Sequence, residues 1–294
     1  MMSEMIPEDT YLSRIIDAHR RADSSRSVDM DMLFEQALKS APPRPFEGWL
    51  TCIKSSRGVG VIAEVKRKSP SKGLLDENMD IVDIARSYEA GGAVAISVLT
   101  DYEFFGGSPD DLAEVKSHAV LPVLRKDFVV SAADVMDSRI MGADAILLIV
   151  AALSRQELKE FISIARTLRM SALVEVHDLD QLDIALNSGA HIIGVNQRDL
   201  HSFEVNRDLA VKVAGVIPAG CIAVAESGIT SSEDARRLAD AGYDAILVGE
   251  YLVKSGDRKA AVEMLSGYRI GKRLFRGSPV STLAGHDDKT LLVR

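Results

Sequence analysis

Acidic, basic and amide side chains follow a series of short apolar segments of this chain. Those that suit proton transfer or ligand binding are Glu64, Lys66, Lys126, Glu175, Asn196, Arg198, Glu226 and Ser227. When lysines and carboxylates are confined together, each shifts the proton affinity of the others, so that one group can donate a proton while another accepts one near neutral pH. The pattern predicts general acid–base catalysis, with Arg198 suited to bidentate binding of a carboxylate.

Two of these segments end in residues that suit phosphate binding. Ser227 and Gly228 follow one segment, and Gly249 and Glu250 follow the next. In barrel enzymes, backbone N–H groups after the last two strands, often with a short helix N-terminus, commonly hold phosphate. We therefore expect a small phosphorylated ligand. We expect no metal site, because the six histidines show no ligand spacing.

The apolar segments are the elements that must position these residues. They cover 59–65, 93–99, 121–125, 145–151, 171–176, 191–196, 221–226 and 243–249. Each is short, rich in Val and Ile and nearly continuous, as is typical of parallel strands buried on both faces. Helical patterns lie between them, over 80–90, 109–118, 131–141, 154–170, 178–188, 206–214, 231–242 and 257–266.

A weak internal repeat favours closure of the strands into a barrel. A glycine followed by an apolar strand recurs at Gly91, Gly142, Gly189 and Gly242, a period of about 50 residues that corresponds to two strands and two helices. Four such units predict the fold class α/β, a (β/α)8 TIM barrel with an N-terminal helical extension. The alternative, a doubly wound open sheet, lacks a Gly-x-Gly-x-x-Gly motif after its first strand.

Three regions follow from this pattern. Residues 1–57 form the N-terminal extension and linker, with helices expected at 10–23 and 28–39 before the segment APPRPF (41–46). Residues 58–270 form the barrel. Residues 271–294 show no periodicity and are expected to be a mobile tail.

Composition excludes several classes of protein. The chain has 294 residues, 47% of them hydrophobic, and a net charge of −8, which argues against a nucleic-acid partner. The longest apolar run, 145–153, is far too short for a membrane helix. We expect a cytoplasmic enzyme, a monomer or weak oligomer, with a small phosphorylated molecule as ligand and no membrane partner.

Each candidate residue also has a structural interpretation. Glu64 and Lys66 could form an ion pair that only stabilises a strand end, and Lys126 could begin a solvated loop. His177 and His191 are expected to be structural. The functional interpretation is favoured because ionisable residues follow at least four separate strands, and because an unpaired carboxylate inside a strand, such as that of Glu175, is costly.

Longer motifs around these residues resemble one known family. They are IAEVKRKSPSKG (62–73), ISVLTDYEFFGGS (96–108), LPVLRKDFVV (121–130), ALVEVHDLDQL (172–182), IIGVNQRDLHSF (192–203) and AVAESGI (223–229). In order and spacing, over about residues 10–270, they resemble indole-3-glycerol phosphate synthase. The resemblance implies a barrel with an extra N-terminal segment and no cofactor. The implied reaction is the decarboxylating, dehydrating ring closure of 1-(2-carboxyphenylamino)-1-deoxyribulose 5-phosphate in tryptophan biosynthesis.

The resemblance also implies catalytic roles. Lys126 would be a general acid that protonates the substrate carbonyl, and Lys66 would lie near the substrate carboxylate and phosphate and share proton donation. Glu175 would assist dehydration as a base, while Glu64 and Asn196 would position the lysines and the substrate. Ser227 belongs both to this set and to the phosphate site. The order in which the two lysines act stays open.

Binding residues follow in the same way. Ser69 and Arg198 would bind substrate, and phosphate would lie against Ser227, Gly228, Gly249 and Glu250. The walls around the anthranilate ring would be Pro70, Phe105, Phe128, Leu147 and Leu200. Glu250 stands where some relatives have serine. The alternatives are another phosphosugar barrel enzyme, such as one similar to phosphoribosylanthranilate isomerase, and a non-catalytic barrel that binds a phosphorylated ligand.

Overall fold

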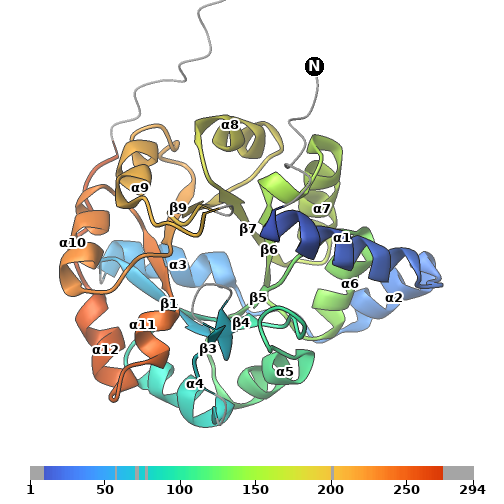
Figure 1. Ribbon diagram of the computed structural model, residues 1–294, viewed down its shortest axis with the longest axis horizontal. Helices are drawn as coiled ribbons and strands as arrows, with labels where there is room; N and C mark the ends of the chain where they lie inside the picture. The colour runs from blue at the N-terminus through green and yellow to red at the C-terminus, as the bar shows by residue number, and fades with distance from the viewer. Residues whose placement is uncertain (1–9, 57, 70–72, 77–78, 200–201, 274–294) are drawn as a thin grey trace, which may run out of the picture.

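The strands close into a single parallel barrel. The computed structural model describes residues 10–56, 58–69, 73–76, 79–199 and 202–273. The barrel strands are β1 (Gly60–Val65), β4 (Ala95–Leu99), β5 (Val123–Lys126), β6 (Ala145–Ile149), β7 (Ser171–Val176), β8 (Ile192–Asn196), β9 (Ile222–Glu226) and β10 (Ala245–Val248). Their order is β1-β10-β9-β8-β7-β6-β5-β4, and β1 also pairs with β4 (Figure 1). The predicted (β/α)8 fold is confirmed.

Helices follow the barrel strands and cover the outside of the barrel. They are α4 (Ile81–Ala90), α5 (Pro109–His118), α6 (Ala132–Ile140), α7 (Arg155–Thr167), α8 (Leu179–Asn187), α9 (Arg207–Ala214), α10 (Ser232–Asp240) and α12 (Arg258–Leu265). Side-chain caps fix where they begin, since Ser131 and Ser154 each form a capping box with the residue three positions on. These helices confirm the predicted alternation of strand and helix.

Two buried aspartates anchor the end of the barrel where the strands begin. Asp144 and Asp244 both follow a glycine by two residues and precede Ala-Ile-Leu. The Oδ2 of Asp144 accepts a hydrogen bond from Val123 N at 2.8 Å, and that of Asp244 accepts one from Ala223 N at 2.8 Å. Each carboxylate therefore fixes the start of a neighbouring strand, and the repeated sequence has a repeated structural role.

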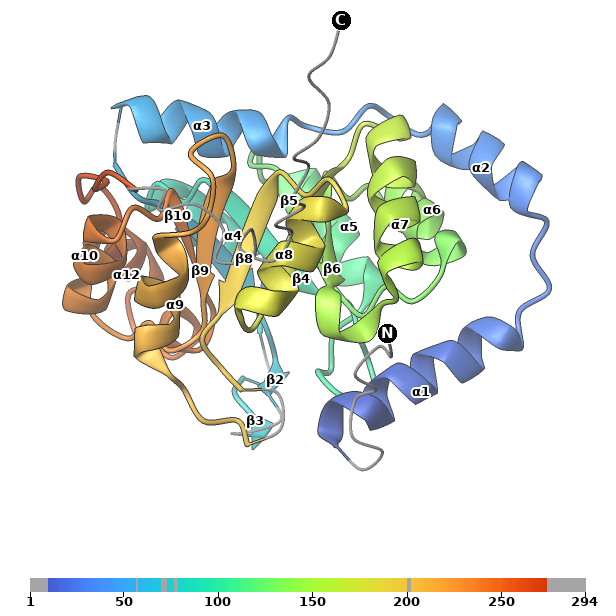
Figure 2. The same cartoon turned by 90° about the horizontal axis from the view of Figure 1, so that it is seen from above.

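The N-terminal extension reaches both ends of the barrel. It contains α1 (Tyr11–Ser24), α2 (Met30–Lys39) and α3 (Phe46–Ser56). Helix α3 lies across the end where the strands begin, whereas α1 lies at the opposite end (Figure 2). The sequence predicted only a linker before the barrel and missed α3. That helix is amphipathic over few residues, and burial of Phe46 and Leu50 against the barrel stabilises it.

Three further short elements were not predicted individually. A hairpin of β2 (Lys68–Ser69) and β3 (Gly73–Leu74) follows β1. The 3-10 helix η1 (Val150–Ala152) follows β6, where the prediction extended the strand, and α11 (Glu250–Val253) follows β10. All three lie in loops at the ends of strands. None of the helices in the described part of the chain is both long and apolar enough to cross a membrane.

The chain after α12 returns to the end of the barrel where the strands begin. Tyr268 O accepts a hydrogen bond from Val59 N at 2.8 Å, and Gly271 N donates to Ala239 O at 2.7 Å. Arg273 forms a buried ion pair with Asp244 at 3.2 Å and donates to Cys221 O at 2.6 Å. Residues 271–273, which the prediction assigned to the tail, thus pack on the barrel. The predicted mobile tail otherwise lies outside the described residues.

We predict that Arg273→Ala destabilises the fold. The Asp244 side chain is 1% exposed, and removing one partner of a buried ion pair typically costs about 3–5 kcal/mol. Since Ala223 N still donates to this carboxylate, we expect a loss near the lower end of that range in the free energy of unfolding, measured by chemical denaturation. Exposed Lys272, changed to alanine, is the control.

Removing 275–294 should leave activity and Tm nearly unchanged, and a large drop in either would contradict the prediction of a loose tail.

Candidate active site

A cavity opens at the end of the barrel where the strands terminate. Its volume is about 700 Å3, and residues from most of the barrel strands and the loops that follow them line it. The predicted site residues that line it are Glu64, Lys66, Ser69, Phe105, Lys126, Phe128, Leu147, Glu175, Asn196, Arg198, Ser227, Gly228, Gly249 and Glu250. Pro70 and Leu200 lie outside the described residues. Every predicted site residue in the described part of the chain therefore lines this one cavity.

The first ion pair of the cavity comes from the end of β1. Glu64 and Lys66 are two residues apart, so their side chains leave the chain on the same side. Lys66 Nζ lies 2.5 Å from Glu64 Oε1, and the two side chains are 17% and 5% exposed. Both residues line the cavity, so that this ion pair at the strand end can also reach a bound ligand.

A second cationic group lies deeper, between two carboxylates. Lys126, at the end of β5, places its Nζ 3.5 Å from Glu175 Oε2 and 3.6 Å from Glu226 Oε2. The carboxylates are each 2% exposed. Charges this deeply buried interact strongly because little water screens them. The three groups can therefore exchange protons with a ligand in the cavity.

Burial and charge set different proton affinities for these groups. Burial works against the ammonium of Lys126, but the charges of Glu175, Glu226 and Glu64 outweigh it and raise the lysine's pKa. Burial also opposes ionisation of Glu175, yet Lys126 and His177 hold its pKa below the usual value. For Glu226, burial and the negative charge of Glu175 raise the pKa to about 8. At neutral pH the site holds a protonated lysine, an ionised Glu175 and a neutral Glu226.

A glycine on β8 and another just after β10 leave room for these carboxylates. A Cβ at Gly194, on β8, would lie 2.2 Å from Glu226 Oε1, and a Cβ at Gly249 would lie 2.2 Å from Glu64 Oε1. Any larger residue at either position would displace the neighbouring carboxylate. Gly249 therefore has a packing role beside the acidic groups as well as its predicted role near phosphate.

The turn after β9 has a strained backbone. Ser227 adopts φ 66° and Gly228 φ 72°, and a non-glycine residue in this region is uncommon and concentrates at functional sites. Gln197 Nε2 donates a hydrogen bond to Ser227 O at 2.8 Å and so holds the turn. Sequence reasoning gave Gln197 no role, because nothing in its spacing shows that its side chain reaches across to the turn after the next strand.

Positively charged residues and Glu250 surround the same part of the cavity. Arg198, Arg207 and Lys254 line it. Arg198 Nη1 donates to Phe203 O at 3.0 Å, which holds the guanidinium against its own loop. Glu250 Oε1 lies 2.7 Å from Lys254 Nζ, so a neighbouring cation offsets the charge of this acidic residue. Arg207 and Lys254 were not predicted as site residues, because they lie beyond the strand ends: Arg207 begins α9 and Lys254 directly follows α11.

The opposite part of the cavity is aromatic. The rings of Phe105 and Phe128 lie with centroids 6.0 Å apart, and Leu147 and Ile149 add aliphatic surface. Such a wall suits a flat apolar group. The cavity thus has an aromatic end, a strained turn beside basic residues at the other end, and buried acid–base groups between them.

Two acid–base residues of the site had no assigned role. Glu226 was recognised as a strand-end residue only. His177 was expected to be structural, but its Nε2 lies 3.3 Å from Glu175 Oε1. That contact could have been suspected from the spacing, because residues 175 and 177 point to the same side of the chain.

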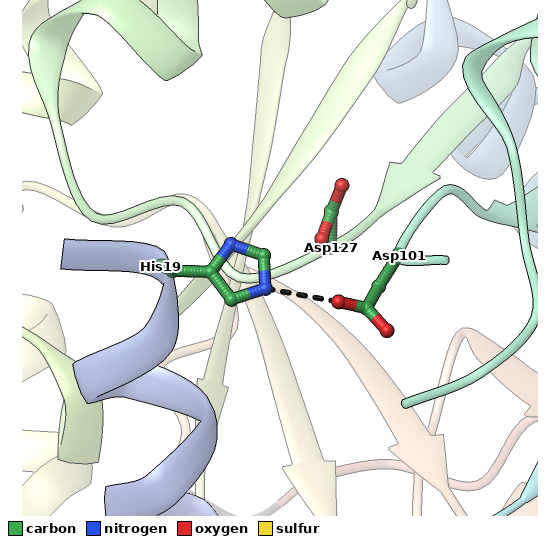
Figure 3. Close-up of side chains that lie close together, drawn as sticks. All are labelled: His19, Asp101 and Asp127. Atoms are coloured by element: carbon green, nitrogen blue, oxygen red, sulfur yellow. Dashed lines mark hydrogen bonds and ion pairs between the residues drawn. The ribbon is translucent and has the colours of Figure 1, made fainter. Parts of the chain in front are cut away.

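One cluster of possible metal ligands lies beside this cavity. His19, Asp101 and Asp127 each bring a ligand atom within 4.8 Å of the others (Figure 3). The Oδ2 of Asp127, however, already accepts hydrogen bonds from Arg125 Nη2 at 2.8 Å and Thr100 Oγ1 at 2.5 Å. A guanidinium so close would repel a metal cation. The cluster therefore fits a hydrogen-bonded network better than a metal centre.

Comparisons with known proteins agree with this arrangement. The family model described as indole-3-glycerol phosphate synthase matches residues 12–265. The chain belongs to the indole-3-glycerol phosphate synthase family. It is 45% identical to the indole-3-glycerol phosphate synthase of Chlorobium phaeobacteroides, an alignment that covers 86% of this chain and 98% of the relative. It is 48% identical to that of Carboxydothermus hydrogenoformans, over 81% of this chain and 90% of the relative.

A solved structure of another protein shares the fold. Thiamine phosphate pyrophosphorylase from Pyrococcus furiosus superposes with a TM-score of 0.50 at 19% sequence identity, over 70% of this chain and 93% of that one. At this identity the likeness concerns the barrel alone. Membership of the synthase family therefore rests on the family model and on the sequence relatives.

We predict that Glu226 titrates near pH 8 and that Glu175→Gln lowers its pKa. The negative charge of Glu175 raises the pKa of Glu226, and removing a like charge this close typically lowers a carboxyl pKa by about 1 unit or more. Carbon-13 NMR of labelled glutamate side chains, recorded across pH 5–10 (about the range in which shifted carboxyls titrate), would measure it. Glu204→Gln, an exposed substitution of the same kind, should leave the pKa unchanged. A carboxyl group at position 226 that is fully ionised at neutral pH would contradict the assignment.

Proposed function

We propose that this chain is an indole-3-glycerol phosphate synthase. The reaction converts 1-(2-carboxyphenylamino)-1-deoxyribulose 5-phosphate to indole-3-glycerol phosphate, with loss of carbon dioxide and water, in tryptophan biosynthesis. The observation that carries this proposal is the placement of Lys126 between Glu175 and Glu226. These groups lie inside a cavity with an aromatic wall at one end and, at the other, the Ser227–Gly228 turn, which suits phosphate binding. The substrate likewise has an aromatic ring at one end, a reacting ketone in the middle and a phosphate at the other end.

Ring closure is the first chemical step. The aromatic carbon that bears the carboxylate attacks the ketone of the ribulose chain, and a lysine ammonium donates a proton to the ketone oxygen. Carbon dioxide then leaves, and the electrons of the broken bond restore the aromatic ring. Lys126 is the main donor because its ammonium lies within the cavity between Glu175 and Glu226, and Lys66 assists near the carboxylate. Holding the flexible substrate so that the two carbons approach to about 3.5 Å supplies part of the acceleration.

Loss of water completes the indole. The new hydroxyl leaves as water, and a proton leaves the neighbouring ring CH2, so that the overall reaction takes up one proton. Glu175 is the base for this step and stabilises the cationic intermediate, since it is ionised at neutral pH. Glu226, neutral at the same pH, can donate a proton to the leaving hydroxyl. Glu64 and Asn196 position the lysines and the substrate.

Binding is divided between the two ends of the cavity. Phosphate lies against the backbone of Ser227, Gly228, Gly249 and Glu250, and Arg198 and Ser69 contribute polar contacts. The Ser69 Oγ is buried and has no hydrogen-bond partner among the described residues, which is common for a group that meets a ligand. The anthranilate ring lies between Phe105, Phe128 and Leu147.

The proposal also includes the compartment, the partners and the oligomeric state of the enzyme. We propose that it acts in the cytoplasm on a small phosphorylated molecule, as a monomer or weak oligomer, without nucleic acid, metal or cofactor. The net charge of −8 supports the exclusion of nucleic acid. Sedimentation of the purified protein would measure the oligomeric state.

The direct test is turnover of the carboxyphenylamino-deoxyribulose phosphate. Indole absorbance should grow when purified protein is added, without added metal, and EDTA should leave the rate unchanged. Phosphoribosylanthranilate should not be isomerised. Absence of indole formation would refute the synthase. Binding of the substrate without turnover would favour a non-catalytic barrel, and isomerisation of phosphoribosylanthranilate would favour the related isomerase.

We predict that Lys126→Ala lowers kcat by about 10²–10⁴-fold, the usual contribution of a general acid, while substantial substrate affinity remains. Steady-state kinetics with indole absorbance as the signal measures both quantities. Exposed Lys159, changed to alanine, is the control. Near-normal turnover by Lys126→Ala would refute its acid role.

Glu175→Gln should act at a later step. We expect slower dehydration, because the amide cannot accept the proton, and the cyclised but still hydroxylated intermediate should build up before indole appears. Stopped-flow absorbance over a single turnover would show this as a lag. If the lag before indole appears is no longer than in the unsubstituted protein, Glu175 is not the dehydration base.

A further inference from the structure

Helix α1 places a histidine at the edge of the candidate active site. His19 Nε2 lies 3.0 Å from Asp101 Oδ2, and its ring packs on Phe128 with centroids 5.6 Å apart. The histidine side chain is 23% exposed and that of Asp101 is 5% exposed. Figure 3 shows the ring directed from α1 toward the two aspartates. His19 is thus a contact between the N-terminal extension and the loops of the cavity.

Asp101 links His19 to the loop after β4. Its Oδ1 accepts hydrogen bonds from the backbone N of Phe104 at 2.6 Å and of Phe105 at 3.0 Å, while its Oδ2 faces His19. The carboxylate therefore has one oxygen committed to the backbone that carries Phe105. The contact with His19 and the backbone that carries Phe105 therefore share one carboxylate.

Asp127 links the cluster to the loop after β5. It follows Lys126 in sequence, and its Oδ1 accepts a hydrogen bond from Phe128 N at 2.9 Å. The buried Arg125 and Thr100 hold its other oxygen. The ring of Phe128 lies between His19 on one side and Phe105 on the other. His19 consequently contacts both loops that supply the aromatic wall.

We propose that His19 is a positioning residue that holds the Phe105–Phe128 wall in place for the aromatic end of the substrate. The identity of that substrate rests on the function proposed above, but the linkage itself rests on the contacts of His19 with Asp101 and Phe128. His19 acts through these residues and does not line the cavity. Its effect falls on binding of the aromatic ring, while the phosphate turn on the far side of the cavity is untouched.

This linkage depends on pH. Burial of the ring disfavours its charge, but the hydrogen bond to Asp101 and the charges of Asp127, Asp101 and Asp134 outweigh burial and raise the pKa of His19. Among the nearby cations, Arg125 is paired with Asp127, and Arg26 Nη1 lies 3.7 Å from Asp134 Oδ1. Below the raised pKa the imidazolium makes a charge-assisted hydrogen bond. As pH rises through that pKa the proton is lost and the bond weakens.

The test measures binding of the aromatic end and of the phosphate end of the substrate separately. His19→Ala should weaken binding of anthranilate, followed by its fluorescence, by about tenfold, as expected for loss of a charge-assisted hydrogen bond. Binding of inorganic phosphate, followed by calorimetry, should not change. In turnover, KM should rise by a similar factor while kcat changes by less than roughly threefold. The wild-type KM should rise as pH passes the pKa of His19, and that rise should be absent in His19→Gln.

Arg20→Ala is the matched control. Arg20 lies next to His19 on α1 and docks the same helix through Glu157 at 2.9 Å, without contact to Asp101 or Phe128. If Arg20→Ala weakens anthranilate binding as much as His19→Ala does, the effect is general docking of α1 and the proposal is wrong. Normal anthranilate binding by a folded His19→Ala protein would also overturn it. Since both binding measurements proceed without turnover, they decide the matter even if the synthase reaction fails.

Discussion

The buried charges at the carboxyl ends of the strands are the constraint on which the rest of this structure depends. One ammonium, that of Lys126, lies between Glu175 and Glu226, both 2% exposed. Such a group of ionisable side chains is costly to bury unless its members are paired and fixed by their surroundings. The closed barrel meets this requirement because parallel strands direct their ends to one place and satisfy each other's backbone hydrogen bonds.

The two ends of the barrel differ in what they contribute: one stabilises the fold, and the other carries the candidate active site. At the end where the strands begin, Asp144 and Asp244 each accept a backbone hydrogen bond and pair with a cationic side chain, and α3 covers the strands. At the other end, Glu226 Oε1 has no hydrogen-bond partner among the described residues, and Ser227 has a strained backbone. Paired charges and a covering helix stabilise one end, while buried acid–base groups and a strained turn lie at the other.

Much of this could be predicted from the sequence, for physical reasons. Strands buried on both faces have continuous apolar sequences, so all eight barrel strands were recognised. Residues such as Glu64 and Lys126 stood out because charge is unexpected at the end of an apolar run. Helix α3 was missed because its stability comes from burial of Phe46 and Leu50 against the barrel. The contact of His177 with Glu175 was missed because a lone histidine was interpreted as structural, although residues 175 and 177 point to the same side of the chain.

By itself, the sequence determined the strand and helix order, the family and the types of side chain at the strand ends, since these follow from local periodicity and from motifs of contiguous residues. Only the tertiary structure decided which groups share protons. The pKa of Glu226 is raised to about 8 by burial and by Glu175, a neighbour distant in sequence. In the same way, His19 meets Asp101 only because α1 folds back onto the barrel. Electrostatic coupling depends on distance in space and on exclusion of water, and barrel closure sets both.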